Sequence, residues 1–310
     1  MKNISTFLFV FISLTTNAQE KSLAEKLGYS ITDKLLIIHA DDIGAAHSEN
    51  VATIASMTKG VVNSTSIMMP CAWSTEVGEL IQDLPDLDIG VHITLTNEWE
   101  NYKWRTISSE VPGLLGPDGY MYPDCASVAI NGSPEEVEKE MRAQIEAALR
   151  IGIKPTHLDS HMGCVYFGRP EYLASFINLA KEYGIPPMLN KEIIDGVVRT
   201  NPTLFEGIDV DNLPLVDQVG MLYPNDYDQI GSDGFYTNWL NNLSAGVNVL
   251  LIHVAYDDAE MQAVTIRHPH FNALWRQADF DFFTSEKARK LINDNDIKLV
   301  TWKQIGSLIH

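Results

Sequence analysis

Short apolar runs alternate with longer amphipathic segments along most of the chain. The apolar runs have the length and composition of strands and lie at 35–39, 62–68, 89–95, 155–159, 187–189, 215–221, 247–253 and 297–301. Segments with helical periodicity lie between several of them, at 48–59, 134–151 and 171–183. A repeated order of strand, helix and strand indicates a parallel sheet covered by helices.

Local signals mark the ends of the predicted helices. Ser48 is the expected N-cap of the first helix, and Ser133 followed by Pro134 is the expected start of the second. Each of the three helices should stop at a glycine, namely Gly60, Gly152 and Gly184. These boundaries support the alternation of strands and helices.

The number of strand candidates favours a closed architecture. About eight strands over roughly 270 residues predict an α/β fold of the (β/α) barrel type, TIM-barrel-like and possibly irregular. Residues 97–133 contain tryptophans, prolines and glycines with little periodicity, so they are expected to form a long loop excursion. No linker or internal repeat divides the chain, and we expect residues 19–310 to form one domain.

The first 18 residues have the pattern of a secretory signal peptide. Lys2 precedes an apolar stretch at 7–14, and small residues up to Ala18 follow it. The stretch is shorter than the roughly 20 residues that a permanent membrane anchor needs. The alternative is an apolar first helix of the domain. The pattern favours export, to the periplasm or the extracellular space.

The net charge of the chain limits the classes of partner that it is expected to bind. The 310 residues carry a formal net charge of -19, which argues against nucleic acid and anionic membranes as partners. A neutral sugar is compatible with so acidic a surface, and an acidic cleft can hold a divalent cation. Oligomeric state is left open.

Three cysteines, Cys71, Cys125 and Cys164, are too widely spaced for a thiolate metal site, and at least one must stay unpaired. We expect Cys71 and Cys164 to be small packing residues.

Two adjacent carboxylates follow the first predicted strand. Asp41 and Asp42 end an apolar run and are followed by Gly44. Successive strand residues point to opposite sides, so the two acids can serve different tasks around one centre. Alternatively, one of the two aspartates caps the following helix and the other is solvated.

His92 lies inside a later apolar strand. It could be a histidine buried in the core or a functional residue.

Later strands add further polar side chains. His157, Asp159 and His161 cluster within five positions, and their spacing suits a metal site on a strand or, for the two histidines, on a helix. His253 ends a hydrophobic strand near the C-terminus. Because the C-terminal ends of barrel strands meet on one face, a shared site explains these residues better than separate core or capping roles.

The segments ADDIG (40–44), VNSTSIM (62–68), GVHITLT (90–96) and PTHLDSH (155–161) resemble the YdjC-like family of carbohydrate deacetylases. That family includes chitooligosaccharide deacetylases and is distantly similar to polysaccharide deacetylases. The resemblance implies a (β/α) barrel that holds a divalent metal through one aspartate and two histidines. After His161 this chain has Met162, Gly163 and Val165 where many members continue with further histidines.

Carried over by position, the resemblance implies that Asp42, His92 and His161 bind the metal, with zinc or magnesium expected. It further implies that Asp41 is the general base and, from a weaker match, that His253 is the general acid that protonates a leaving sugar amine. His157 or Asp159 would then orient a metal ligand.

Aromatic residues of the excursion and beside it could stack on sugar rings, or they could simply pack the loop against the barrel. These residues are Trp99, Tyr102, Trp104 and Tyr166. The expected activity is removal of acetyl groups from N-acetylated sugars or oligosaccharides. Two alternatives stay open, a metal-dependent hydrolase of another amide or ester bond and a non-catalytic sugar-binding protein.

Overall fold

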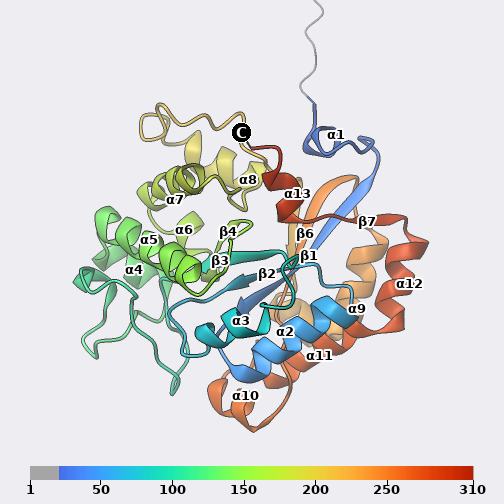
Figure 1. Ribbon diagram of the computed structural model, residues 1–310, viewed down its shortest axis with the longest axis horizontal. Helices are drawn as coiled ribbons and strands as arrows, with labels where there is room; N and C mark the ends of the chain where they lie inside the picture. Colours follow the sequence, from blue (N-terminus) through green and yellow to red (C-terminus); the bar gives the residue numbers. More distant parts are fainter. Residues whose placement is uncertain (1–20, 310) are drawn as a thin grey trace, which may run out of the picture.

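A parallel sheet lies at the centre of the molecule (Figure 1). The computed structural model describes residues 21–309, so the predicted signal peptide lies outside the described residues. The strands are β1 (Lys34–Ile43), β2 (Ser64–Ile67), β3 (Ile89–Ile93), β4 (Leu158–Ser160), β5 (Gln218–Met221), β6 (Gly246–Ile252) and β7 (Ile297–Leu299). The order is β4-β3-β2-β1-β6-β5, with β7 paired to the start of β1, and every pairing is parallel.

The two edges of this sheet approach each other through residues 187–190. Isolated parallel bridges join Leu158 to Pro187 and Asn190 to Val216. The segment predicted as a strand at 187–189 therefore forms only bridges, since Pro187 has no N–H to donate to a ladder. The prediction of an irregular (β/α) barrel is confirmed, with seven strands among the described residues in place of eight.

Helices cover the sheet on its outer faces (Figure 1). The longer ones are α2 (His47–Lys59), α3 (Ser74–Leu80), α4 (Cys125–Asn131), α5 (Pro134–Arg150), α7 (Pro170–Tyr183), α9 (Pro224–Asn241), α11 (Ala273–Thr284) and α12 (Glu286–Asp294). The shorter ones are α1 (Leu23–Lys26), α6 (Cys164–Phe167), α8 (Lys191–Ile193), α10 (Ala259–Val264) and α13 (Trp302–Gly306). None of the helices in residues 21–309 combines the length and the apolar character needed to cross a membrane.

All of the sequence signals at the helix ends hold except Ser48, since Gly60 ends α2 and Gly152 directly follows the C-cap of α5. Ser133 caps α5 by accepting a hydrogen bond from the N–H of Glu136, whose side chain returns the contact. Gly184 ends α7 in the left-handed conformation, at a φ of 68°. Ser48 is not the N-cap of α2, which begins one residue earlier; its N–H donates instead to Glu260 Oε2 at 2.8 Å, so a carboxylate from another helix satisfies this end.

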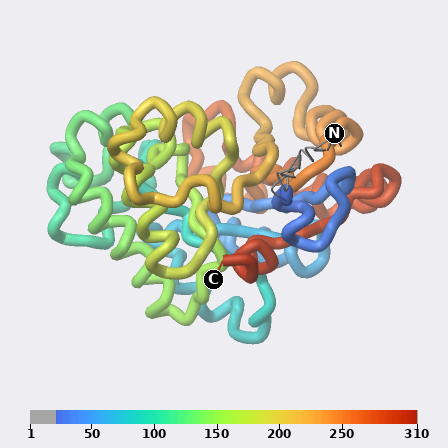
Figure 2. Tube along the Cα trace, turned by 90° about the horizontal axis from the view of Figure 1, so that it is seen from above, coloured from blue at the N-terminus to red at the C-terminus, as the bar shows by residue number. Residues whose placement is uncertain are grey.

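Apolar residues pack between the sheet and the helices in separate clusters. The largest cluster joins β2 and β3 to α5 and α7, and a second joins β1 and β6 to α9, α11 and α12. Leu23 of α1 packs in one cluster with Trp302 of α13, so the first and last described helices lie together, as Figure 2 shows in blue and dark red. Strands held from both sides give a rigid base for residues at their ends.

Candidate functional site

Asp41 and Asp42 lie where strand β1 leaves the sheet. The pairing of β1 with β2 shifts register between Ala40 and Ile43, which bends the strand at the two acids. Asp42 has a φ of 73°, a left-handed conformation that is uncommon for a residue with a side chain. Such strain of about 1–3 kcal/mol persists where surrounding contacts impose it. The bend directs the two carboxylates to different neighbours.

Asp42 faces two histidines from neighbouring strands. Its Oδ1 lies 3.3 Å from Nε2 of His92, on β3, and 3.3 Å from Nδ1 of His161, just after β4. The three side chains are buried, and one ligand atom from each lies within 4.8 Å of the others. Asp42 Oδ1 has no hydrogen-bond partner among the described residues. A buried carboxylate oxygen between two imidazole nitrogens fits a divalent transition metal such as zinc.

Each of these histidines is held by a carboxylate at its other nitrogen. His92 Nδ1 lies 2.8 Å from Asp159 Oδ1, and His161 Nε2 lies 3.0 Å from Glu98 Oε2. Carboxylates in this position fix the ring orientation of metal-binding histidines and make them better ligands. Glu98 was not predicted from the sequence, because it begins an aperiodic segment in which no pattern distinguishes it.

Two other groups of three residues could hold an ion by distance alone, and both contain Asp159. The oxygens of Asp159 are already occupied, Oδ1 by His92 and Oδ2 by His39 at 2.8 Å and Ser66 at 2.7 Å. Asp42 Oδ1, in contrast, has no such partner. The set Asp42, His92 and His161 therefore suits a metal best.

Arg276, on α11, occupies the second oxygen of Asp42. Its Nη2 donates to Asp42 Oδ2 at 2.9 Å, its Nη1 donates to Glu49, and its guanidinium lies 5.5 Å from the ring centre of Trp99. Burial alone would raise the pKa of Asp42, but the charge of Arg276 and the close imidazoles of the two histidines outweigh it and hold that pKa well below its usual range. Asp42 thus stays ionised and offers Oδ1 alone.

Asp41 lies beside His253, which follows β6. Asp41 Oδ2 is 3.8 Å from His253 Nε2, and the same nitrogen is 3.9 Å from Asp42 Oδ2. Burial lowers the pKa of His253 to about 4, so its imidazole is neutral at neutral pH. The main-chain N–H of His253 donates a hydrogen bond to Asp279 Oδ2 at 3.2 Å, which holds the backbone at this position. The predicted base and acid therefore border the metal-binding set on one side.

His157 and Asp159, both predicted to orient a ligand, lie in different places. Asp159 contacts His92 directly. His157 lies away from the three metal-binding candidates: its ring stacks on Trp302 and forms a T-shaped contact with the ring of His39. Its Nδ1 is 3.0 Å from the Thr156 hydroxyl. Of these two residues, only Asp159 makes a described contact with one of the three metal-binding candidates.

The aromatic residues of the excursion pack against one another. Trp99 is 2% exposed and Trp104 is 4% exposed, and their rings meet edge to face 5.5 Å apart. Neither ring offers a face to a sugar in this structure, since both faces are covered, so these two residues pack the loop. Tyr166 packs on Phe176, and its buried hydroxyl has no hydrogen-bond partner among the described residues.

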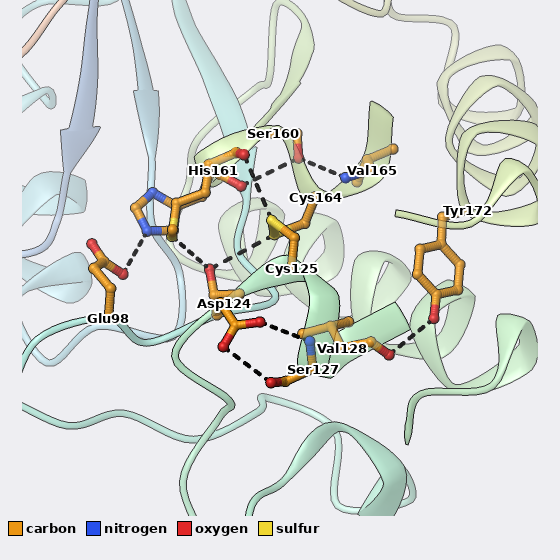
Figure 3. The surroundings of a disulfide bond; sticks show 12 residues. Glu98, Asp124, Cys125, Ser127, Val128, Ser160, His161, Cys164, Val165 and Tyr172 are labelled. Carbon is orange, nitrogen blue, oxygen red and sulfur yellow. Dashed lines mark hydrogen bonds and ion pairs between the residues drawn. A yellow bond between two sulfur atoms is a disulfide. The ribbon is translucent and has the colours of Figure 1, made fainter. Parts of the chain in front are cut away.

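A disulfide joins Cys125 of α4 to Cys164 of α6, directly after the turn that carries His161 (Figure 3). The prediction that Cys164 is a small packing residue is therefore wrong, because its sulfur is bonded to Cys125. Cys71 is free and buried, as that prediction expected. The turn between His161 and Cys164 includes Met162 at a φ of 53° and Gly163 at a φ of 70°. Figure 3 places His161 between this bridge and Glu98, so both anchor it to the excursion.

Reducing this disulfide is expected to weaken metal binding. Without the bridge the strained turn after β4 is tied down less, and His161 samples orientations away from Asp42. Loss of one outer support of a metal ligand costs about 10- to 100-fold in affinity, and we expect the lower end of that range. Chelator competition before and after dithiothreitol measures it. Cys71→Ala should respond like the wild type, and the double variant Cys125→Ala with Cys164→Ala should not respond. Equal affinities in both redox states would contradict this expectation.

Metal affinity is also expected to rise with pH between about 6 and 9. Burial alone would lower the pKa of His161, but the carboxylates of Glu98 and Asp42 outweigh it and raise that pKa to about 9. Asp159 and Asp41 likewise outweigh burial at His92 and raise its pKa well above the usual value. Both imidazoles must lose a proton to bind metal, so binding releases protons and each adds up to about tenfold in affinity per pH unit. Calorimetry in buffers of different ionisation enthalpy counts the protons that metal binding releases. A metal affinity that does not change with pH would exclude His92 and His161 as ligands.

Comparisons with known proteins show which family the chain resembles. The model of a family described as "YdjC-like protein" matches residues 35–294. A carbohydrate deacetylase of Thermus thermophilus is 30% identical over 285 residues, which cover 91% of this chain and 97% of that protein. A chitooligosaccharide deacetylase of Yersinia enterocolitica is 31% identical over 130 residues, 42% of this chain and 49% of that protein.

A solved structure shares the fold. It comes from Enterococcus faecalis, is described as a cellobiose-phosphate cleavage protein, and superposes with a TM-score of 0.71 at 25% identity. The match covers 90% of this chain and all of that one.

Proposed function

Since the chain belongs to the YdjC-like family, we propose that it is a metal-dependent hydrolase that removes acetyl groups from N-acetylated sugars or oligosaccharides. The observation that carries the proposal is the arrangement of Asp42, His92 and His161 around one unpartnered carboxylate oxygen, with Asp41 and His253 alongside. Relatives named carbohydrate deacetylases match over most of the chain.

In this proposal the three residues hold a divalent ion, and two imidazole ligands favour zinc over magnesium. When bound, such an ion polarises the amide carbonyl and lowers the pKa of the attacking water. Asp42 presents Oδ1 alone because Arg276 occupies Oδ2. Asp159 and Glu98 keep the two rings turned toward that oxygen. One carboxylate and two imidazoles leave coordination positions open for water and substrate, as catalytic sites do.

Proton transfer falls to Asp41 and His253. Asp41 Oδ2 takes the proton of the attacking water as the new C–O bond forms at the acetyl carbon. His253 begins neutral, because burial lowers its pKa to about 4, so it must first receive a proton before it can donate one. Its Nε2 is 3.8 Å from Asp41 Oδ2, close enough for a proton to pass between them with a small movement. The C–N bond then breaks, the amine leaves with that proton, and acetate remains.

The decisive experiment is acetate release from a panel of N-acetylated and O-acetylated saccharides. The purified protein should be stripped of metal and then loaded in parallel with zinc, magnesium, cobalt or nickel. Release from N-acetylated members that needs added metal is the expected result. Hydrolysis of O-acetyl or other amide bonds alone would identify a hydrolase of another class. Binding of saccharides without any acetate from any loaded form would identify a sugar-binding protein.

We further propose that the protein is exported and that residues 1–18 are removed. The pattern around Ala18 supports cleavage there. The disulfide between Cys125 and Cys164 supports the same view, because disulfides persist mainly in oxidising compartments. Mass spectrometry of the protein from a cell fraction outside the cytoplasmic membrane should give a chain that begins at Gln19. A full-length chain confined to the cytoplasm would refute export.

A further inference from the structure

His39 is fully buried on β1, two positions before Asp41 and on the same face of the strand. Its Nε2 is hydrogen-bonded to Asp159 Oδ2 at 2.8 Å, and it also lies 3.1 Å from Asp41 Oδ1, an ion-pair contact to an oxygen that has no hydrogen-bond partner among the described residues. The proposed metal set does not include His39, and none of its hydrogen bonds reaches Asp42, His92 or His161. A buried imidazole between the proposed base and the carboxylate that orients His92 therefore needs an explanation of its own.

The proton on this ring can be placed from its neighbours. Ionised carboxylate oxygens only accept hydrogen bonds, so Nε2, which faces two of them, must carry a hydrogen. Nδ1 is 2.8 Å from the hydroxyl of Ser64, which can donate or accept. Ser64 stands directly opposite His39 in the pairing of β1 with β2. The ring is therefore held at both nitrogens, and the direction of the Nε2–H is determined by the sheet.

The two oxygens of Asp41 consequently have different surroundings. Oδ1 points inward to His39, whereas Oδ2 points outward to His253. A carboxylate that could rotate freely would present either oxygen, or neither, to an attacking water. Positioning of this kind contributes strongly to catalysis because small displacements of a reacting group slow the reaction.

We propose that His39 is a positioning residue for Asp41: the ion-pair contact of its Nε2 with Asp41 Oδ1, at 3.1 Å, keeps that oxygen of the base inward and leaves Oδ2 free to take the proton of water. The inference rests on the proposed function, in which Asp41 is the general base. His39 acts through Asp41 and does not touch the substrate. The sheet thus supports the base from behind, as Asp159 supports His92.

The test compares His39→Leu with His39→Gln. Leucine removes the donor, while the amide of glutamine can place an N–H near the position of Nε2. At saturating metal we expect His39→Leu to lower kcat by about 10- to 100-fold, less than the 10² to 10⁴ typical of a lost general base, with KM unchanged. His39→Gln should recover most of kcat. Elemental analysis should find equal metal in both variants and the wild type.

Asn248→Leu is a matched control, because Asn248 is buried on the neighbouring strand β6 and its side chain bonds main-chain carbonyls away from the site. It should lower the melting temperature and keep kcat. Wild-type kcat in metal-loaded His39→Leu would overturn the inference, as would glutamine no better than leucine, or a loss explained entirely by missing metal. No acetate release by the metal-loaded wild type would refute the proposed function itself, a result separate from these.

Discussion

Asp42→Ala is expected to lose both bound metal and acetate release. Asp42 Oδ1 is the oxygen that faces His92 and His161, at 3.3 Å from each, and alanine leaves two imidazoles without the carboxylate between them. Affinity should fall by more than the roughly 10- to 100-fold that follows loss of an outer partner, because a direct ligand is removed. Elemental analysis and chelator competition measure this, alongside an acetate assay.

The loss must be separated from simple destabilisation. Asp42 is buried and paired with Arg276, and breaking a buried ion pair costs about 3–5 kcal/mol. Asp88→Asn provides the comparison: Asp88 is a buried carboxylate that accepts hydrogen bonds from the N–H groups of Trp302 and Lys303, far from the site. It should melt earlier yet keep its metal and its activity. Full metal content in folded Asp42→Ala would show that the metal is held elsewhere.

Asp41→Asn is expected to keep the metal and lose turnover. An amide cannot take a proton from water, so kcat should fall by about 10²- to 10⁴-fold, the usual contribution of a general base. Asp42, His92 and His161 do not depend on Asp41 for their contacts with one another, so metal content should match the wild type. Steady-state kinetics at saturating metal, with elemental analysis of the same sample, test both halves.

Two outcomes of this experiment would change the mechanism. Unchanged acetate release in Asp41→Asn would remove Asp41 from the reaction. Loss of metal together with activity would assign Asp41 to the metal set, a role that its distance to His92 and Asp159 allows in one of the alternative groups. His253→Gln adds a comparison: if His253 relays a proton received by Asp41, this variant should also keep the metal and lose kcat.

Much of the candidate site was accessible from the sequence because strands have a simple geometry. Asp42, His92 and His253 each interrupt or end an apolar run, and the ends of parallel strands meet at one face of a barrel. The structure brings these residues together as expected. The roles of acid and base remain predictions until the variants are measured.

Other contacts had no sequence signal. Arg276 is separated from Asp42 by 234 residues, and Glu98 is separated from His161 by 63. Arg276 stands in a helix where a charged residue usually faces solvent, and Glu98 stands in a segment without periodicity. His39 appears in the sequence as one more polar residue beside two acids, and its role depends on which atoms its ring faces. Pairings of this kind are set by how helices and loops pack onto the sheet.

The parallel α/β architecture and the strand ends that carry Asp42, His92 and His161 follow from the sequence alone, because alternation and apolar runs are local properties of the chain. Tertiary structure alone decided that Cys125 pairs with Cys164, that Trp99 and Trp104 are buried, and that carboxylates support both histidines. These features depend on distances between segments far apart along the chain, and only the packing of the whole barrel specifies such distances.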